Sequence, residues 1–237
     1  MNKIPSENII RVGGQVETFD KTGKIVLDCL FKELNNIDYN FDDCSNALDL
    51  GCGCGRVSLH FIEEFPKTRL FACDVDHSSV NSLPKDNYNL VPIVNLARPP
   101  LPYLNNYFDL TFSVSVWTHL NETLQYEWLD ELNRILTPDG VALVTIASYH
   151  TLAIHRKKKL QHALKTSDIE LGEKGFVFFP QNQTAERSWP GTEDYGLALH
   201  SQKYIEAYWS KHIKVVKVVP GGIAGGQDIV ILKKLED

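Results

Sequence analysis

The chain has 237 residues, of which 43% are hydrophobic and 23% charged, and its formal net charge at pH 7 is -6. These values are typical of a folded globular protein and exclude a disordered, fibrous or collagen-like chain. The acidic balance argues against broad binding to nucleic acid or to an anionic membrane, because both require a cationic surface. No apolar stretch approaches the roughly 20 residues of a transmembrane helix, and residues 1–6 lack the layout of a secretory signal.

The cysteines are odd in number and all lie in the first third of the chain: Cys29, Cys44, Cys52, Cys54 and Cys73. A secreted disulfide framework would have an even number of cysteines spread along the chain. The sequence therefore predicts a protein of the reducing cytosol. One residue separates Cys52 from Cys54, whereas zinc-binding cysteine pairs are usually separated by two to four. We therefore expect no metal site and interpret these two cysteines as small residues that a turn tolerates.

Predicted helices and strands alternate through the first two thirds of the chain. Apolar residues recur at helical spacing in Lys21–Asn35. The predicted strands are Ala47–Leu50, Leu70–Cys73, Leu90–Val94, Asp109–Val116 and Val141–Ala147, and the helices between them are Val57–Phe65, Ser78–Leu83 and Glu122–Leu136. This alternation predicts a parallel sheet with helices on both faces.

Local signals refine this pattern at three places. Pro92 lies inside the third predicted strand and cannot donate to a ladder, which predicts an edge position for that strand. Asn121 is placed to cap the helix that begins at Glu122. The run Thr137-Pro138-Asp139-Gly140 is typical of a turn and predicts the end of that helix.

The alternation of strands and helices stops over residues 149–195. A connection of this length in a compact domain is usually a functional lid or a disordered segment, and we expect a lid inserted after the fifth strand. This segment holds a basic helical stretch, Ile154–Lys165, and aromatic residues that could face a substrate or form the lid's own core: Phe176, Phe178, Phe179, Trp189 and Tyr195. A helix at Gln202–Lys211 and an antiparallel hairpin of Ile213–Val219 with Asp228–Leu232 follow. We expect one domain over residues 1–237, with an N-terminal helical segment over residues 1–40.

The most informative run joins the first strand to its helix and reads Asp49-Leu50-Gly51-Cys52-Gly53-Cys54-Gly55. Glycines here let a ligand approach the backbone closely, and the following helix offers free N–H groups. A dinucleotide-binding turn has the spacing G-x-G-x-x-G, whereas this turn has G-x-G-x-G preceded by an acid. The Asp49 carboxylate would oppose a diphosphate and suits a ligand that bears an amine or a sulfonium. The alternative is a turn that needs glycine for steric reasons alone.

A second acidic residue, Asp74, ends the second predicted strand, 21 positions after Gly53. A carboxylate at this point is placed to accept hydrogen bonds from a ribose diol. Its neighbour Asp76 is placed to cap the next helix.

Together these motifs resemble the class I S-adenosylmethionine-dependent methyltransferases, whose first motif is Asp-x-Gly-x-Gly-x-Gly and whose second strand ends in an acid. The resemblance continues through Asn95–Pro102, Phe108–Leu110, Ser115–Leu120 and Glu131–Gly140. It extends from about Lys21 to the C-terminus and is weakest over residues 149–195. Within the family, the chain is similar to a bacterial subgroup that resembles enzymes of polysaccharide modification.

The resemblance implies an α/β, Rossmann-like, seven-stranded sheet in the order 3-2-1-4-5-7-6, with the last strand antiparallel and a lid insertion after strand 5. It implies S-adenosyl-L-methionine as the cofactor. The residues that it implies for cofactor binding are Asp49, Gly51, Cys52, Gly53 and Gly55 around the methionine portion, Asp74 with Val75 at the ribose, Asn95 with Leu96 at the adenine, and Ser113 with Val114 on the sulfonium side.

A general base would help if the methyl acceptor is a hydroxyl, because its pKa is high. His119 follows the fourth strand on the edge where open α/β sheets bind ligands, which makes it a candidate base. The alternative is that His119 packs against the helix that begins at Glu122. Tyr149 and His150, just after the fifth strand, are further candidates on the same edge.

The sequence therefore predicts a cytosolic methyltransferase that modifies an oxygen or nitrogen of a small molecule or glycan precursor. The acceptor and the oligomeric state stay open. The alternatives are a nucleic-acid or protein methyltransferase, an NAD-dependent oxidoreductase and a catalytically silent cofactor-binding module. The net charge argues against nucleic acid, the glycine spacing argues against the oxidoreductase, and the intact motifs argue against the silent module.

Overall fold

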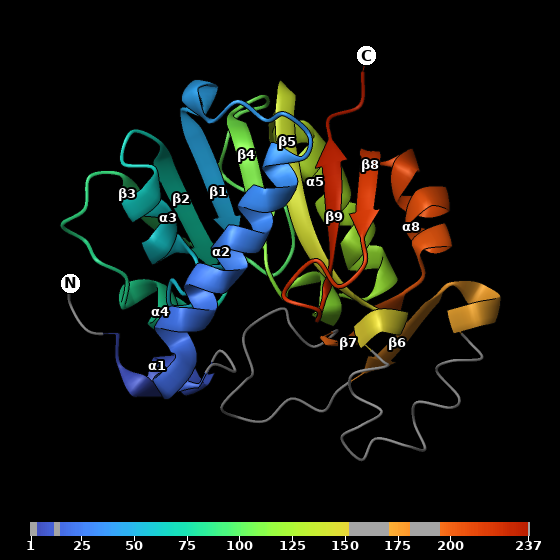
Figure 1. Cartoon of the computed structure of the whole chain (residues 1–237), viewed down its shortest axis with the longest axis horizontal. Helices are drawn as coiled ribbons and strands as arrows, with labels where there is room; N and C mark the ends of the chain where they lie inside the picture. Colours follow the sequence, from blue (N-terminus) through green and yellow to red (C-terminus); the bar gives the residue numbers. More distant parts are fainter. Residues whose placement is uncertain (1–3, 12–14, 152–170, 181–194, 237) are drawn as a thin grey trace.

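The structure, a computed structural model, describes residues 4–11, 15–151, 171–180 and 195–236. The predicted basic stretch Ile154–Lys165 and Trp189 lie outside these residues. The described chain forms a central sheet with helices on both faces (Figure 1). None of the described helices has the length and apolar character that crossing a membrane requires.

The sheet has the predicted strand order. Its strands are β1 Asn46–Leu50, β2 Arg69–Asp74, β3 Leu90–Val94, β4 Phe108–Ser113, β5 Leu136–Ser148, β8 Lys214–Val219 and β9 Asp228–Lys233. The first five are parallel, and β9 runs antiparallel to β5 and to β8. The order β3-β2-β1-β4-β5-β9-β8 is the predicted 3-2-1-4-5-7-6, because β8 and β9 are the predicted sixth and seventh strands. β3, which contains Pro92, pairs within the described sheet only with β2, as its predicted edge position requires.

Two apolar layers fix the helices on the sheet. Helices α2 Phe19–Asn35, α3 Ser58–Glu64 and α4 His77–Asn81 cover one face, and α5 Glu122–Ile135 and α8 Gln202–Tyr208 cover the other (Figure 1). Because side chains alternate along a strand, Ala47 of β1 packs with the first group, whereas Leu48 and Leu50 pack with the second. A short helix, α1 Ser6–Arg11, precedes α2. As predicted, Asn121 caps α5 by accepting from the Leu124 N–H at 2.9 Å.

The predicted turn at Thr137–Gly140 is wrong, because these residues belong to β5. Strand β5 begins at Leu136, directly after α5, and Leu136 pairs with Phe108 of β4. The pairing then shifts register, so that Leu110 lies opposite Val141. Because of this register shift, the residues of the predicted turn are accommodated within strand β5. A Cβ at Gly140 would lie 2.8 Å from the Phe108 carbonyl oxygen, so glycine permits the close approach of the two strands.

The sequence did not indicate two strands, one of which lies in the segment predicted as a lid. Strand β6 Phe176–Pro180 pairs antiparallel with β7 Gly196–His200. β7 in turn pairs parallel with the carboxyl end of β5, through Ala147 with Leu199 and Ser148 with His200. The hairpin therefore lies at the edge of the molecule where the carboxyl ends of β1, β4 and β5 meet (Figure 1).

Candidate functional site

The glycine turn after β1 has the backbone that the motif predicts. Gly51, Gly53 and Gly55 all adopt positive φ, at 82°, 53° and 87°. At Gly51 an added Cβ would lie 2.1 Å from a Val116 methyl carbon, so glycine is required there by both conformation and space. The N–H of Gly51 donates to the Cys73 carbonyl at 2.8 Å, which ties the turn to the end of β2.

Asp74 is positioned by backbone groups on two sides. Its carboxylate accepts the Gly53 N–H and the Asp76 N–H, each at 2.8 Å. Each carboxylate oxygen then keeps further lone-pair capacity for a ligand hydroxyl. Burial raises the pKa of Asp74 above its ordinary value. Asp76 accepts from Ser78 N–H and Ser79 Oγ and caps α4, so the predicted capping interpretation is confirmed.

Asp49 lies behind the turn and is buried. Its carboxylate accepts a hydrogen bond from Ser58 Oγ at 2.5 Å. Burial is the main cause that raises the pKa of Asp49 to about 7, and the nearby charge of Asp74 adds to the effect. Asp49 is not in the wall of the pocket described next, so its charge would act on a ligand from behind the turn.

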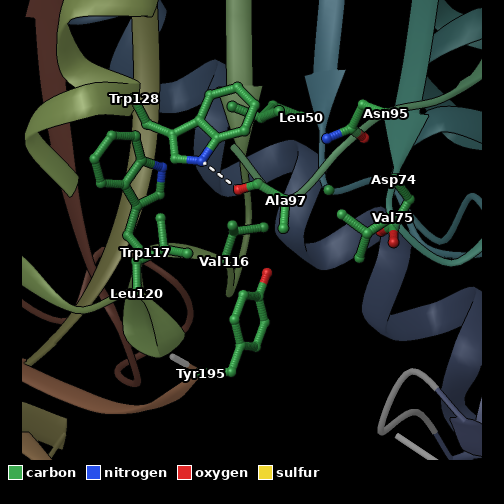
Figure 2. A pocket seen from close by; sticks show the side chains of 11 residues that line it. Leu50, Asp74, Val75, Asn95, Ala97, Val116, Trp117, Leu120, Trp128 and Tyr195 are labelled. Atoms are coloured by element: carbon green, nitrogen blue, oxygen red, sulfur yellow. Dashed lines mark hydrogen bonds between the residues drawn. The ribbon is translucent and has the colours of Figure 1, made fainter. Parts of the chain in front are cut away.

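A pocket lies between the turn, the ends of β2 to β4 and the lid hairpin (Figure 2). Its cavity volume is about 50 Å³, and it is partly open to solvent. The lining residues are Leu50, Gly51, Asp74, Val75, Asn95, Ala97, Val116, Trp117, Leu120, Trp128 and Tyr195. Apolar walls with a few polar groups are typical of a site for a cofactor or a small substrate.

Asn95 offers this pocket an acceptor without a partner. Its Nδ2 donates to the Leu96 carbonyl at 2.7 Å, and its Oδ1 is buried and has no hydrogen-bond partner in the part of the chain that the structure describes. A buried acceptor left unpaired costs free energy of roughly 1–3 kcal/mol, which a ligand donor would recover. The adenine amino group is such a donor, and Asp74 suits the ribose, so the residues present fit S-adenosylmethionine.

Only part of the predicted cofactor set lines the pocket: Gly51, Asp74, Val75 and Asn95. Leu96 is 77% exposed, and Ala97 takes its place in the wall. Ser113 is buried and donates to the Leu50 carbonyl at 2.8 Å, which joins β4 to β1. Val114 packs on the opposite face of the sheet, with the layer of α2 and α3. Gly53 and Gly55 shape the turn without lining the pocket.

The cysteines of the site are buried thiols. Cys52, Cys54 and Cys73 are each at most 6% exposed. Burial raises the pKa of all three, to about 11 for Cys54. A thiol with a raised pKa is a poor nucleophile and a poor metal ligand. Within the described residues, no group of three or more His, Cys, Asp or Glu side chains could hold a metal ion.

The candidate bases are placed differently from one another. His119 ends a 3₁₀ turn, Trp117–His119, and its Nδ1 lies 2.8 Å from the Gly196 carbonyl oxygen. His119 does not line the pocket, but its ring stacks against Tyr195, which does. His150 lies against Gly221 in the β8–β9 connection, and Tyr149 is 46% exposed; neither lines the pocket.

The pocket also contains residues that the sequence interpretation missed. Val116 and Trp117 directly follow the β4 end, so the rule that ligands bind at the carboxyl ends of strands could have found them. Trp128 comes from α5, with its Nε1 donating to the Ala97 carbonyl at 3.2 Å, and it reaches the site through long-range packing, which leaves no local sequence signal. Tyr195, for which the sequence left open a ligand-facing position or a place in the lid's own core, lines the pocket.

Comparisons with known proteins agree with this fold. Residues 47–140 match the family model described as a methyltransferase domain. A solved S-adenosylmethionine-dependent methyltransferase of Methanosarcina mazei is 17% identical, covers 86% of this chain and 98% of its own, and has a TM-score of 0.56.

Two curated relatives match parts of the chain. The trans-aconitate 2-methyltransferase of Deinococcus radiodurans is 29% identical over 57% of this chain and 49% of its own length. The mouse mitochondrial arginine-hydroxylase NDUFAF5 is 33% identical over 40% of this chain and 26% of its own length. The chain thus spans half or less of the length of these relatives, whose named activities differ. The comparisons agree on two points: residues 47–140 match a methyltransferase domain, and the described chain has the fold of a solved S-adenosylmethionine-dependent methyltransferase.

Proposed function

We propose that this chain is an enzyme that transfers a methyl group from S-adenosylmethionine to an oxygen or nitrogen of a small molecule or glycan precursor. The observation that carries the proposal is the pocket beside the glycine turn, which is lined by Asp74 and by Asn95, whose Oδ1 has no hydrogen-bond partner among the described residues. A methyltransferase fold alone does not establish activity, because one fold hosts many functions. The proposal therefore rests on the polar groups of this pocket.

The residues present have distinct roles toward the cofactor. Asp74 would accept from the ribose hydroxyls, and Asn95 Oδ1 would accept from the adenine amino group. Leu50, Ala97 and Trp128 supply apolar wall. When bound, the cofactor supplies a methyl group already activated by a sulfonium. The chain then has to hold the acceptor atom in line with that methyl, and orientation alone can lower a barrier by ~7–11 kcal/mol.

For a hydroxyl acceptor we propose His119 as the general base. In a neutral ring, the contact of Nδ1 with the Gly196 carbonyl places the proton on Nδ1, because a carbonyl oxygen can only accept. Nε2 then keeps its lone pair and can take a proton from the acceptor. A positioned base of this kind contributes on the order of 10²–10⁴ in rate.

The test is a screen for transfer of a labelled methyl group from S-adenosylmethionine to hydroxyl, amine and carboxyl compounds, with peptides and nucleic acids included. Transfer to a small hydroxyl or amine compound supports the proposal. Transfer to a nucleic acid or protein alone would assign the domain to a macromolecular substrate. Absence of transfer to any class, with the cofactor bound, would favour a silent binding module.

His119→Ala should lower kcat for a hydroxyl acceptor by on the order of 10²-fold or more, with cofactor affinity nearly unchanged. His212→Ala is the control, because His212 is partly exposed and pairs with Asp130 on the surface at 2.7 Å. Equal turnover in the His119 variant and the wild type would remove His119 from the reaction.

A further inference from the structure

Tyr195 reaches the cofactor pocket from the lid. It directly precedes β7 and lines the pocket together with Asp74 and Val116. In Figure 2 its hydroxyl points into the pocket, toward the side where Val116 and Ala97 lie. The glycine turn and the strand ends form the remaining walls. Tyr195 therefore shares a site with Asp74, although it follows Asp74 by 121 positions in the sequence.

The fold fixes the backbone that carries Tyr195. Gly196 lies opposite Pro180 in the antiparallel β6–β7 hairpin. A Cβ at Gly196 would lie 2.3 Å from the Phe179 carbonyl oxygen and 2.5 Å from the Phe178 ring, so the two strands are in close contact there. Because β7 also pairs with the end of β5, Tyr195 is held against the carboxyl edge of the main sheet.

The same segment holds His119 through two contacts. The rings of Tyr195 and His119 stack with centroids 6.0 Å apart and an interplanar angle of 9°. The Gly196 carbonyl oxygen lies 2.8 Å from His119 Nδ1. The ring stack restricts rotation of the imidazole, and the carbonyl selects the tautomer with Nδ1 protonated. Residues 195 and 196 therefore set both the plane and the protonation pattern of His119.

The Tyr195 hydroxyl is available to a ligand. Within the described residues it makes no hydrogen bond, whereas Asp74 already accepts two backbone N–H groups. Burial raises the pKa of Tyr195 above its ordinary value, and the nearby Asp74 charge raises it further, so the hydroxyl keeps its proton. A protonated phenol in a pocket with apolar walls is a hydrogen-bond donor without a partner.

We propose that Tyr195 is a cofactor-binding residue, whose hydroxyl donates a hydrogen bond to bound S-adenosylmethionine, and that its ring is the positioning surface for His119. This inference rests on the proposed function and extends it, because one lid residue then serves both the cofactor site and the candidate base. Cofactor binding and the orientation of His119 become linked through the β6–β7 hairpin.

The test separates the hydroxyl from the ring by comparing Tyr195→Phe with Tyr195→Ala. Isothermal titration with S-adenosylmethionine should show about three- to tenfold weaker binding for Tyr195→Phe, the loss expected for one neutral hydrogen bond, and a larger loss for Tyr195→Ala. Tyr208→Phe is the matched control, because Tyr208 lies on α8, is 43% exposed and is absent from the pocket wall. It should bind like the wild type.

Nitrogen NMR of the His119 ring tests the positioning role. The wild type and Tyr195→Phe should both show the proton on Nδ1, whereas Tyr195→Ala should show a mixture of tautomers. Thermal denaturation checks that each variant folds, and Tyr195→Phe keeps the whole ring and tests the hydrogen bond even where Tyr195→Ala does not fold.

Wild-type affinity in Tyr195→Phe would overturn the hydrogen bond to the cofactor, and an unchanged His119 tautomer in Tyr195→Ala would overturn the positioning role. Failure of the wild type itself to bind S-adenosylmethionine would instead contradict the proposed function.

Discussion

Asp49 and Asp74 are neighbouring buried carboxylates with different surroundings. Asp74 accepts two backbone N–H groups and lines the pocket, whereas Asp49 accepts one hydroxyl and lies behind the glycine turn. Burial raises the pKa of both. The negative charge of Asp49 would attract a bound sulfonium. Without a bound cation, the same buried charge destabilises the folded protein.

Because of this destabilisation, we expect Asp49→Asn to be more stable than the wild type by an amount that depends on pH. The asparagine keeps an oxygen that accepts from Ser58 and cannot ionise. The pKa of Asp49 is raised to about 7, so its favourable neutral form persists at low pH and its contribution to stability is lost as pH rises from about 4 through 7. Without cofactor, the variant should be more stable than the wild type by roughly 1–3 kcal/mol at about pH 8 and nearly equal at about pH 4. Urea denaturation at both pH values measures this, and a pH-independent difference would contradict it.

At the scale of elements, the glycine turn combines a local signal with a long-range contact. The positive φ values follow from the spacing of Gly51, Gly53 and Gly55, which the sequence shows. The contact that makes Gly51 irreplaceable comes from Val116, 65 positions later by number, which no local pattern reports.

Gly51→Ala and Gly225→Ala separate these two effects, because Gly225 has a similar φ of 78° and no atom of the described residues lies within 4 Å of an added Cβ. Gly225→Ala should cost only backbone strain of about 1–2 kcal/mol and leave cofactor binding intact. Gly51→Ala should cost more, because Val116 must move, and should weaken S-adenosylmethionine binding at least tenfold. Comparable effects of the two changes in calorimetry and thermal denaturation would show that space at Gly51 is unimportant.

The lid hairpin carries a second pH-sensitive group. His200 of β7 is fully buried, and its Nε2 lies 2.9 Å from Gln125 Oε1, whose amide nitrogen donates to the Leu120 carbonyl. Because the Gln125 amide nitrogen donates to the Leu120 carbonyl, Gln125 Oε1 faces His200. His200 Nε2 therefore donates a hydrogen bond to Gln125 Oε1. Burial lowers the pKa of His200 to about 3.

A lowered pKa means that His200 supports the fold when neutral, at pH above about 6.5, and that this support is lost as pH falls toward 3. We expect His200→Gln, which keeps a donor for Gln125 and does not titrate, to lose less stability than the wild type between about pH 7 and pH 4. Denaturant unfolding at a series of pH values checks this, and parallel stability curves would show that His200 does not titrate on unfolding in this range.

Over the whole molecule, the parts predictable from sequence are those with local or periodic signals. The helix and strand alternation, the edge position of Pro92 and the cap at Asn121 all follow from patterns within a few residues, and the structure confirms them. The Thr137–Gly140 prediction failed because strand pairing with Phe108 outweighed turn propensity. Trp128 enters the pocket through tertiary packing, which no local pattern reports, whereas the sequence named Tyr195 as an aromatic residue that faces either a ligand or the lid's own core.

The central claim is that the pocket beside the glycine turn binds S-adenosylmethionine through Asp74. Isothermal titration of the wild type, Asp74→Ala and the exposed control Asp86→Ala with S-adenosylmethionine and with NAD tests it most directly. The account predicts binding of S-adenosylmethionine and not NAD, a loss of about 1–3 kcal/mol in Asp74→Ala, and wild-type affinity in Asp86→Ala. Tight NAD binding without S-adenosylmethionine binding, or undiminished affinity in Asp74→Ala, would contradict it.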